Sequence, residues 1–495
     1  MLKKITALLF ASLMLASLTA CSADPNMKVT VMTPGAENEE KPSGEEEPHG
    51  LLISPGPARD TEDAETGESE PADVLLVSAQ YPEMVRNVSS GDYIKPNGTF
   101  DDAAYEEDRA AWSEYWSMQF EKGTGLSEKL AAFNEKLGDF LAGAGTENRV
   151  FSPVSMYMAL AILAEAAEGE TREEILSLLG AENIEDARDT ASRLFLSTYV
   201  DNGEYLADNA ASLWLKQGLS VDEDVLQKIA ESYFASVYQG DPEDPAYLKA
   251  LQDWLNEKTG GMLKDAVDNV NMDPEMVLSI ATTVYFRGKW QYPFSAEYNE
   301  TLTFHGAAGD TEAEFMTKET DDLYCFYDHF GAVRLSFSGG AGMWLILPDE
   351  GYTPEEIAKE ADFIKCIGGE YDESHEKYCI INMKVPKFDV SSDLDMCDTL
   401  KGLGIEKAFL RDGADFTGLI REEMPVWLSE VKHAARCTID EEGCTATAFT
   451  LEMLCGAAMP DGTVDFTLDR PFLFAITNSF GSVLFTGIVN QVPGK

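Results

Sequence analysis

One stretch of this chain, residues 154–167, is apolar on nearly every side and constrains the fold more than any other feature. Ser152 and Pro153 stand directly before it. Serine is a preferred helix N-cap and proline is favoured at the first helical position, so the stretch is predicted to be a helix. A helix without a polar face cannot lie at a surface. We therefore expect a central helix that is surrounded by the rest of a large domain.

Helical patterns come early in the chain and strand patterns come late. One face of an amphipathic helix ahead of the central one is traced by Leu126, Leu130, Phe133, Leu137, Phe140 and Leu141. Beyond the central helix, Thr171 and Glu174 have the spacing of a capping box, and Gly180 is placed to end the short helix that follows. Strand character appears in the ranges 283–286, 343–347, 380–385, 464–468, 472–477 and 483–489. This order indicates an α+β fold with large, partly antiparallel sheets.

The N-terminus has the features of an export signal. Lys3 and Lys4 precede an apolar run over residues 5–18, which is too short to span a membrane and is typical of a signal peptide. The run ends in a short segment that resembles a bacterial lipobox: Leu18, Thr19, Ala20 and Cys21.

The lipobox resemblance implies that residues 1–20 are removed as a lipoprotein signal peptide and that Cys21 carries lipid. At least two acyl chains are implied, and two chains hold a protein at a membrane where one binds only marginally. The sequence therefore predicts an exported protein that is lipid-anchored to a bacterial membrane at the cell surface. The alternative is an ordinary cleavage site with an incidental cysteine.

Three segments follow the predicted anchor. Residues 21–73 are rich in Pro, Gly, Ser and acidic runs and poor in aromatic residues, which is typical of a disordered tether. Residues 74–125 are predicted to be an N-terminal extension with a helix that packs on the main domain. Aromatic residues at helical spacing support that helix: Trp112, Tyr115, Trp116 and Phe120. Residues 126–495 are predicted to form one continuous domain.

Charge and cysteine content exclude several classes of function. The chain has 88 acidic and 37 basic side chains and a formal charge of −51, whereas phosphate binding needs clustered cations. Nucleic acid is therefore excluded as a partner. The cysteines beyond Cys21 are odd in number and form no CxxC pair, which indicates neither a disulfide framework nor a metal cluster. We expect no cofactor and no metal.

Motifs of the common enzyme classes are absent from the sequence. There is no GxSxG elbow, no HExxH, no P-loop and no GxGxxG after a strand. His433 lies in the apolar range 431–435 and is expected to be a hydrogen-bonded core histidine. Glu441 and Glu442 could in principle do acid and base work, but paired acids in so acidic a chain are more often solvated. We therefore expect a protein that is not an enzyme.

Several motifs, in order along residues 126–495, resemble the serpin family. They are found at 152–155, 284–290, 385–388, 403–405, 414–418, 428–435, 441–443 and 470–472. The resemblance implies one serpin domain with three β-sheets, about nine helices and an exposed reactive loop. It also implies a serine protease inhibitor that acts as a suicide substrate. The protease attacks the loop, forms an acyl-enzyme, and is trapped when the cleaved loop inserts as a strand into the central sheet.

The same resemblance places the reactive bond between Ala457 and Ala458, by the family's spacing from Glu441. The neighbouring loop subsites are then Leu454, Cys455, Gly456 and Met459. Small residues at the bond favour an extracellular protease with a shallow or tolerant pocket, elastase-like or subtilisin-like, over a trypsin-like or chymotrypsin-like one. The cut could also lie a residue or two away, for instance at Met459.

The hinge of the loop corresponds to Glu441, Glu442, Gly443, Cys444, Thr445, Ala446, Thr447 and Ala448. In a strand the even-numbered residues from 444 to 450 would face the core, and all of them are small, which favours insertion. Cys444 and the bulky Phe449 depart from the family's usual pattern. The alternative function is therefore a non-inhibitory serpin that serves as a surface binding or scaffolding protein.

Further positions match the places where the central sheet opens in serpins. The polar cluster beneath the sheet is matched by Ser152, Ser155 and His433. Thr282 stands where the family has an Asn in that cluster. Trp290 and Lys387 match the region where insertion starts, and an ion pair between Lys387 and Glu441 is a hypothesis there. The resemblance favours a monomer.

Overall fold

The structure is a computed structural model of the 495-residue chain. It describes residues 74–494 except 86–87, 89, 203–204, 262–269, 370–372, 422–424 and 445–459. The predicted signal peptide, Cys21 and the tether lie outside the described residues, and so does the predicted reactive bond. Among the helices that are described, none combines the length and the apolar character needed to cross a bilayer.

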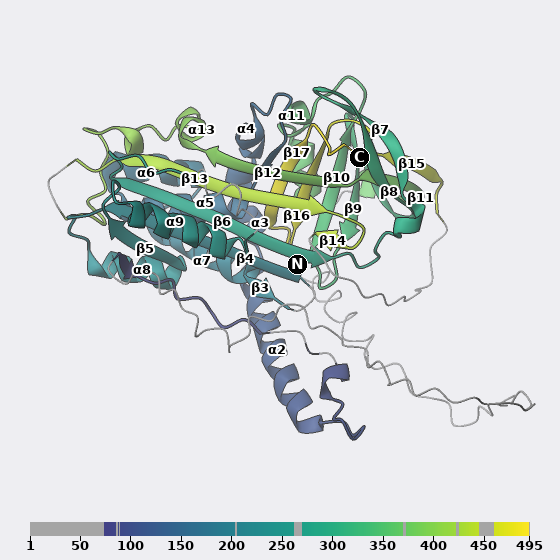
Figure 1. Cartoon of the computed structure of the whole chain (residues 1–495), viewed down its shortest axis with the longest axis horizontal. Coiled ribbons are helices and arrows are strands. Elements are labelled where there is room, and N and C mark those ends of the chain that lie inside the picture. Colours follow the sequence, from purple (N-terminus) through teal and green to yellow (C-terminus); the bar gives the residue numbers. More distant parts are fainter. Residues whose placement is uncertain are drawn as a thin grey trace, which may run out of the picture. The chain divides into compact units, whose positions relative to one another are not determined.

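The first of two large sheets has eight described strands (Figure 1). In spatial order they are β1 (Leu75–Val77), β5 (Ala235–Gly240), β4 (Tyr205–Lys216), β6 (Leu278–Lys289), β14 (Gly443–Cys444), β13 (Leu428–Ile439) and β12 (Phe388–Asp395), with β3 (Val200–Asp201) paired to β4. The central strands β4 and β6 are buried along most of their length, because helices pack on both of their faces. This sheet contains the predicted strand at 283–286.

The second sheet has nine described strands. In spatial order they are β15 (Thr463–Thr467), β11 (Glu376–Pro386), β8 (Gly309–Phe326), β9 (Phe330–Ser336), β10 (Gly342–Pro348), β16 (Phe472–Thr477), β17 (Val483–Val489) and β2 (Arg149–Phe151), with β7 (Glu300–Gly306) paired to β8. The other five predicted strands lie here. The described strands thus form two hydrogen-bonded networks rather than three, because the long β8 pairs with β7 and β11 and also, at its end, with β9.

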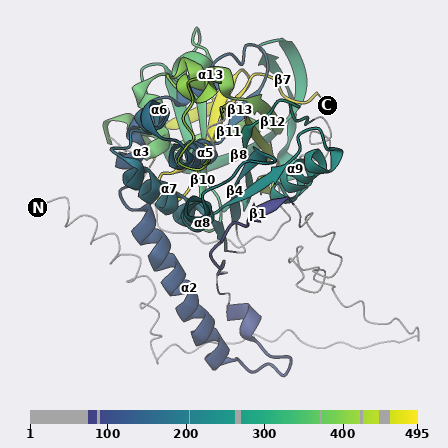
Figure 2. The same ribbon diagram turned by 90° about the vertical axis from the view of Figure 1, so that its left-hand side faces the viewer.

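The central helix predicted from the apolar stretch is α5 (Pro153–Ala166), and every residue in it is buried. Its N-cap is Ser152, whose side chain accepts a hydrogen bond from the Ser155 amide. α5 contacts β4 and β6 of the first sheet and β17 of the second, so it lies inside the domain (Figure 2). Its one acid, Glu165, is neutralised by Arg188 at 2.8 Å and accepts a hydrogen bond from Tyr233.

The other described helices surround these sheets. They are α2 (Asp102–Gly123), α3 (Leu126–Asn134), α4 (Leu137–Leu141), α6 (Gly169–Leu179), α7 (Ile184–Thr198), α8 (Glu223–Ser232), α9 (Pro245–Lys258), α11 (Pro354–Ile357), α12 (Ala361–Gly368) and α13 (Cys397–Gly402). The single amphipathic helix predicted over 126–141 is divided into α3 and α4. The division comes at Lys136, whose amide bonds to the carbonyl of Phe133 in a tighter turn. The apolar face itself is buried as predicted.

The predicted capping box is wrong, because α6 begins at Gly169 and neither side chain caps it. Thr171 Oγ1 accepts a hydrogen bond from the Asp415 amide at 3.0 Å. The Glu174 carboxylate accepts two hydrogen bonds at 2.8 Å, from the amides of residues 406 and 407. Both side chains therefore hold distant loops rather than their own helix, which short-range spacing could not reveal. The helix does end at Gly180, which has a positive φ of 69°.

The extension contains the predicted helix as α2, and only its C-terminal half packs on the domain. Tyr115 is buried and donates a hydrogen bond to the carbonyl of Tyr199 at 2.7 Å. Trp116 and Phe120 both contact the ring of Phe480. The N-terminal half of α2 extends away from the sheets (Figures 1 and 2).

Candidate functional site

At one end of the first sheet, β6 and β13 are no longer paired with each other. β6 and β13 pair in parallel from Leu428 to Ala434 on β13, and beyond that point they pair with each other no further. The two-residue strand β14 lies between them there, antiparallel to both (Figure 1). Cys444 is opposite Gly288 of β6 and Ile439 of β13. We call the part of the sheet between 284–289 and 435–439 the seam, and the start of the predicted hinge already occupies it.

Gly443 allows the hinge backbone to enter the seam between β6 and β13. Its φ is +148°, a backbone conformation that glycine adopts readily and other residues rarely do. A Cβ atom there would also press against the carbonyl oxygen of Gly288. Asp440 closes the preceding turn, since its carboxylate accepts hydrogen bonds from the amides of Glu442 and Gly443 at 2.9 and 3.2 Å. Cys444 then follows with its side chain buried in the core.

Trp290, at the end of β6, holds the turn from the other side. Its indole Nε1 donates to the carbonyl of Asp440 at 3.0 Å, and its amide donates to the carbonyl of Glu442 at 2.9 Å. The ring is buried and stacks on Phe337 with centroids 4.4 Å apart. Trp290 is therefore fixed by packing and presents two donors to the hinge backbone.

A charged network holds the Glu441 side chain. Lys387 Nζ lies 2.7 Å from the Glu441 carboxylate and 3.2 Å from that of Glu314, so the hypothesised ion pair is present. Burial works against the lysine charge, but hydrogen bonds to both carboxylates outweigh it and raise the pKa of Lys387. Burial likewise raises the pKa of Glu441, and the hydrogen bonds from Lys387 and Asn299 reverse that effect and lower it.

A polar cluster links the start of α5 to β6 and β13. His433 is fully buried, and its Nε2 accepts a hydrogen bond from the Ser152 amide at 3.0 Å. Its Nδ1 therefore carries the proton and donates to Thr282 Oγ1 at 3.2 Å. Ser155 Oγ donates to the carbonyl of Thr283 at 3.3 Å. Burial lowers the pKa of His433 to about 4, so the ring is neutral.

Thr282 takes the place of the expected Asn without leaving the histidine unpaired. His433 and Thr282 are also register partners on β13 and β6, at the inner end of the seam. Any strand that enters the sheet this far must separate these two residues. The cluster thus adds a side-chain hydrogen bond between β6 and β13 close to the end of their paired part.

Some predicted site residues are brought together here and others are not described. Trp290 bonds to the carbonyl of Glu442, and Lys387 pairs with Glu441. His433 bonds to Ser152 and Thr282, and Ser155 bonds to the carbonyl of Thr283. Hinge residues 445–448, the subsites and the reactive bond lie outside the described residues. Asn299 and Glu314 were missed by the sequence, because only the fold brings β7, β8 and the hinge together.

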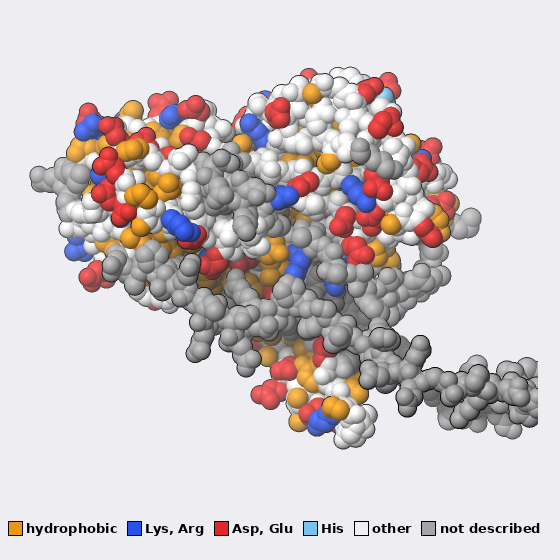
Figure 3. Space-filling model, in the orientation of Figure 1, with side chains coloured by type: hydrophobic (Ala, Val, Ile, Leu, Met, Phe, Trp, Pro, Cys, Tyr) orange, Lys and Arg blue, Asp and Glu red, His pale blue; other side chains and the backbone are white. Residues whose placement is uncertain are grey.

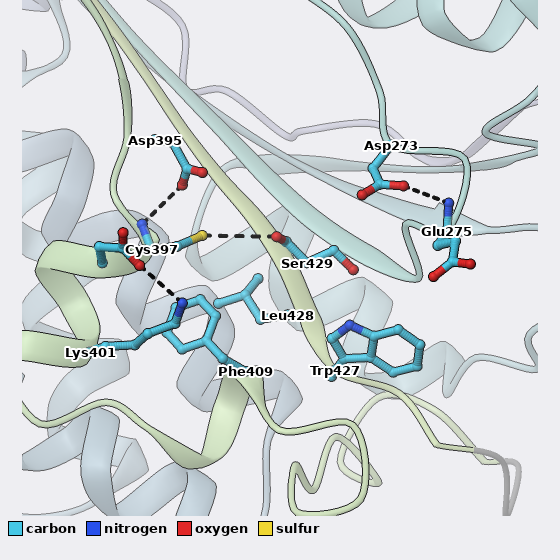
Figure 4. A pocket seen from close by; sticks show the side chains of 10 residues that line it. Asp273, Glu275, Asp395, Cys397, Lys401, Phe409, Trp427, Leu428 and Ser429 are labelled. Carbon is cyan, nitrogen blue, oxygen red and sulfur yellow. Dashed lines mark hydrogen bonds and ion pairs between the residues drawn. The ribbon is translucent and has the colours of Figure 1, made fainter.

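A surface pocket of about 310 Å³ lies beside the other end of β13, near residues 427–429 (Figure 4). Several of its acids already have partners, since Asp395 accepts from the Cys397 amide and Asp273 from the Glu275 amide. Lys401 pairs with Asp398 and lies over the ring of Phe409. No group of ligands suited to a metal occurs among the described residues. The pocket is remote from the hinge network and adds no chemistry to it.

Charged side chains of both signs occur on the described surface shown in Figure 3. On the face shown in Figure 3, Asp and Glu side chains are spread over the described surface. The Lys and Arg side chains on that face lie singly or in small groups among them.

A family model described as "Serpin (serine protease inhibitor)" matches residues 130–492. The chain belongs to the serpin family. Among curated serpins, Serpin-Z2B of Oryza sativa subsp. japonica is 28% identical over 404 residues, which cover 73% of this chain and 96% of that protein. An uncharacterized serpin-like protein of Thermococcus kodakarensis is 31% identical, over 70% of this chain and 81% of its own length.

Solved serpin structures share the fold. The native state of tengpin, a thermophilic serpin, superposes with a TM-score of 0.66 at 27% identity, covering 74% of this chain and 93% of its own. Thyroxine-binding globulin in complex with thyroxine gives a TM-score of 0.63 at 22% identity, over 75% of this chain and 99% of its own. The α+β serpin fold is therefore confirmed.

Membership of the serpin family also indicates the general kind of function. The family supports protease inhibition as the general activity and serine proteases as the general kind of partner. Serpins are mostly inhibitors rather than catalysts. The thyroxine complex shows that the same fold also occurs in a protein with a small-molecule ligand.

Proposed function

We propose that this serpin inhibits serine proteases as a suicide substrate whose cleaved loop inserts into the seam. The observation that carries the proposal is β14, since Cys444 is already paired with both strands that border the seam and Gly443 is paired with β6. Cleavage of the loop beyond residue 444 would free the rest of it to continue the same strand. Strand addition of this kind would supply β6 and β13 with backbone hydrogen-bond partners along the seam.

The register of β14 defines where each further loop residue would go. Continuing from Cys444, position 446 would lie between Cys437 and Phe286, and position 448 between Ala435 and Val284. All four neighbours are buried. Position 450 would come between His433 and Thr282, so the hydrogen bond between these two residues would have to break. The loop has Ala446, Ala448 and Thr450 at these inward positions, and each is small enough for a buried slot.

We infer that the target has a shallow or tolerant specificity pocket, as elastase-like and subtilisin-like proteases do. The proposed bond between Ala457 and Ala458 presents only small side chains. The protease serine would attack the carbonyl of Ala457 and release the Ala458 amine, leaving an acyl-enzyme. Insertion would then displace the catalytic groups, and a misplacement of about 1 Å can cost on the order of a hundredfold in rate.

The proposed location is the outer surface of a bacterial membrane, with lipid on Cys21. This placement rests on the resemblance of residues 18–21 to a lipobox. The acidic, proline-rich range 21–73 would then separate the serpin domain from the membrane. The proposed partner is accordingly an extracellular protease.

A non-inhibitory surface binding or scaffolding protein is the second candidate function. Phe449 in the loop and the thyroxine complex of a related fold favour it. Incubation with pancreatic elastase and with subtilisin, followed by denaturing electrophoresis, separates the two. A detergent-stable complex of serpin and protease is expected. Complete cleavage of the loop without any complex would support the second candidate instead.

A further inference from the structure

The hinge network holds more negative than positive charge. Lys387 is shared between the carboxylates of Glu314 and Glu441, which leaves one net negative charge among the three groups. Glu441 has only 15% of its side chain exposed, so water screens it weakly. The carboxylates of Glu314 and Glu441 repel each other, which offsets part of their attraction to Lys387. A polar group that donates to both carboxylates would reduce this repulsion.

Asn299 is that group. Its Nδ2 donates to Glu441 at 2.5 Å and to Glu314 at 3.3 Å, so one amide bridges the two acids. Carboxylates only accept, which fixes the amide nitrogen toward them. The Oδ1 of the same amide is buried and has no hydrogen-bond partner among the described residues. Asn299 thus uses its donors in the network while its acceptor is left unsatisfied.

The position of Asn299 connects the hinge to the second sheet. It caps the short helix η3 (Ala296–Tyr298) and directly precedes β7, whose partner strand β8 contains Glu314. The amide of Phe294, in the same connection, donates to the carbonyl of Glu441 at 2.9 Å. Backbone and side chain of Glu441 are therefore both held by this one segment of the chain.

We propose that Asn299 is a positioning residue for loop insertion, and that its amide keeps Glu441 beside Glu314 and Lys387 so that β14 is seated in the seam before a protease arrives. This inference rests on the proposed function. The seated hinge is the first paired part of the inserted strand, so insertion after cleavage only has to extend it. An unseated hinge must first enter the sheet, which gives the acyl-enzyme time to hydrolyse.

The seating of the hinge can be measured without a protease, because Cys444 is 2% exposed in the seated hinge. The native protein is alkylated with iodoacetamide, and labelling at each cysteine is followed by peptide mass spectrometry. Asn299→Asp replaces the donor with a third carboxylate, and Cys444 should then be labelled at least about tenfold faster than in the wild type. Asn299→Ala, which removes the donor without adding charge, should give an intermediate rate. Cys366, which is buried on α12 and outside the seam, should stay unlabelled and reports that the fold is intact.

A charge-restoring variant separates positioning from simple packing. Asn299→Asp combined with Glu314→Gln returns the network to one net negative charge and should restore slow labelling of Cys444. The matched control combines Asn299→Asp with Glu312→Gln. Glu312 lies on the same strand and bonds to Thr303 outside the network, so this change should restore nothing.

Protection of Cys444 in Asn299→Asp, or failure of Glu314→Gln to restore protection, would overturn the seating role. The stoichiometry of elastase inhibition tests the second half of the proposal. It should rise several-fold in Asn299→Asp and return in the double variant with Glu314→Gln. An unchanged stoichiometry alongside fast labelling would show that seating does not matter for insertion. Absence of any complex in the wild type would instead refute the proposed function, while the labelling result would still decide the seating of the hinge.

Discussion

Cys444, in the seam, is the register partner of Ile439 on β13, and both side chains are buried. This single pair sets the register of everything that would follow in the loop. Because side chains alternate along a strand, residues 446 and 448 would share the inward face of Cys444 in an inserted loop, and residues 445 and 447 would share the outward one. The pair also shows that a cysteine fits at the start of the hinge, where the sequence had marked it as a departure.

Substitution of inward and outward loop residues should have unequal effects. Ala448→Glu would bury a carboxylate between Ala435 and Val284 without a partner, at a cost of several kcal/mol. Thr447→Glu should place the same group in solvent. Moles of serpin consumed per mole of protease inactivated should rise strongly for the first variant and little for the second. Equal effects would mean that the register does not continue from β14.

Specificity should follow the residue before the proposed cut. Ala457→Arg should transfer complex formation from elastase to trypsin, because the trypsin pocket requires a basic side chain. Mass spectrometry of the peptide released on complex formation identifies the bond. A trypsin complex that forms through any other bond would show that the reactive position is misassigned.

Stability should fall with acid because His433 is buried in its neutral form. Its pKa is about 4 in the folded protein against 6.5 for the free group, so the unfolded chain binds the proton first as pH falls. The stabilisation is complete above pH 6.5 and is lost between there and pH 4, which amounts to about 3 kcal/mol. His433→Gln keeps an acceptor and a donor but does not titrate, so its unfolding midpoint should vary less with pH over this window. Parallel curves for the two proteins would contradict the assignment.

The anchor prediction depends on one residue. If Cys21 carries lipid, Cys21→Ser should move the protein from the membrane fraction to the soluble fraction of the producing bacterium. The unfolding midpoint of the serpin domain should not change. Recovery of the wild-type protein in the soluble fraction would refute the lipobox interpretation.

Much of the fold followed from local patterns, because those patterns reflect burial. The apolar stretch that became α5 and the later strands could be placed this way. The family motifs led to Trp290, Lys387 and His433, since these residues match the family position by position. Local patterns and motifs carry no information about contacts between residues that are far apart in the sequence. Thr171 was misread as a cap because its real partner is at Asp415.

The pairing of the hinge with β6 and β13 could also not be predicted from the sequence. Whether β6 pairs with β13 along its whole length or admits β14 depends on the balance between two sets of strand contacts. Asn299 carried no signal for a similar reason, since an isolated asparagine before a strand has no pattern of its own. Both features appear only when the hinge and the two sheets are considered together.

The central claim is that the loop continues β14 into the seam, and nicking the loop tests it most directly. Thermolysin is a suitable enzyme, since a metalloprotease forms no acyl-enzyme and cannot be trapped. After a nick near Ala457 the strand should enter the sheet and release the strain that holds the native form, so the unfolding temperature should rise by about 10 °C or more. The same nick in Ala448→Glu should give a smaller rise. An unchanged or lower unfolding temperature in the nicked wild type would show that the loop does not insert.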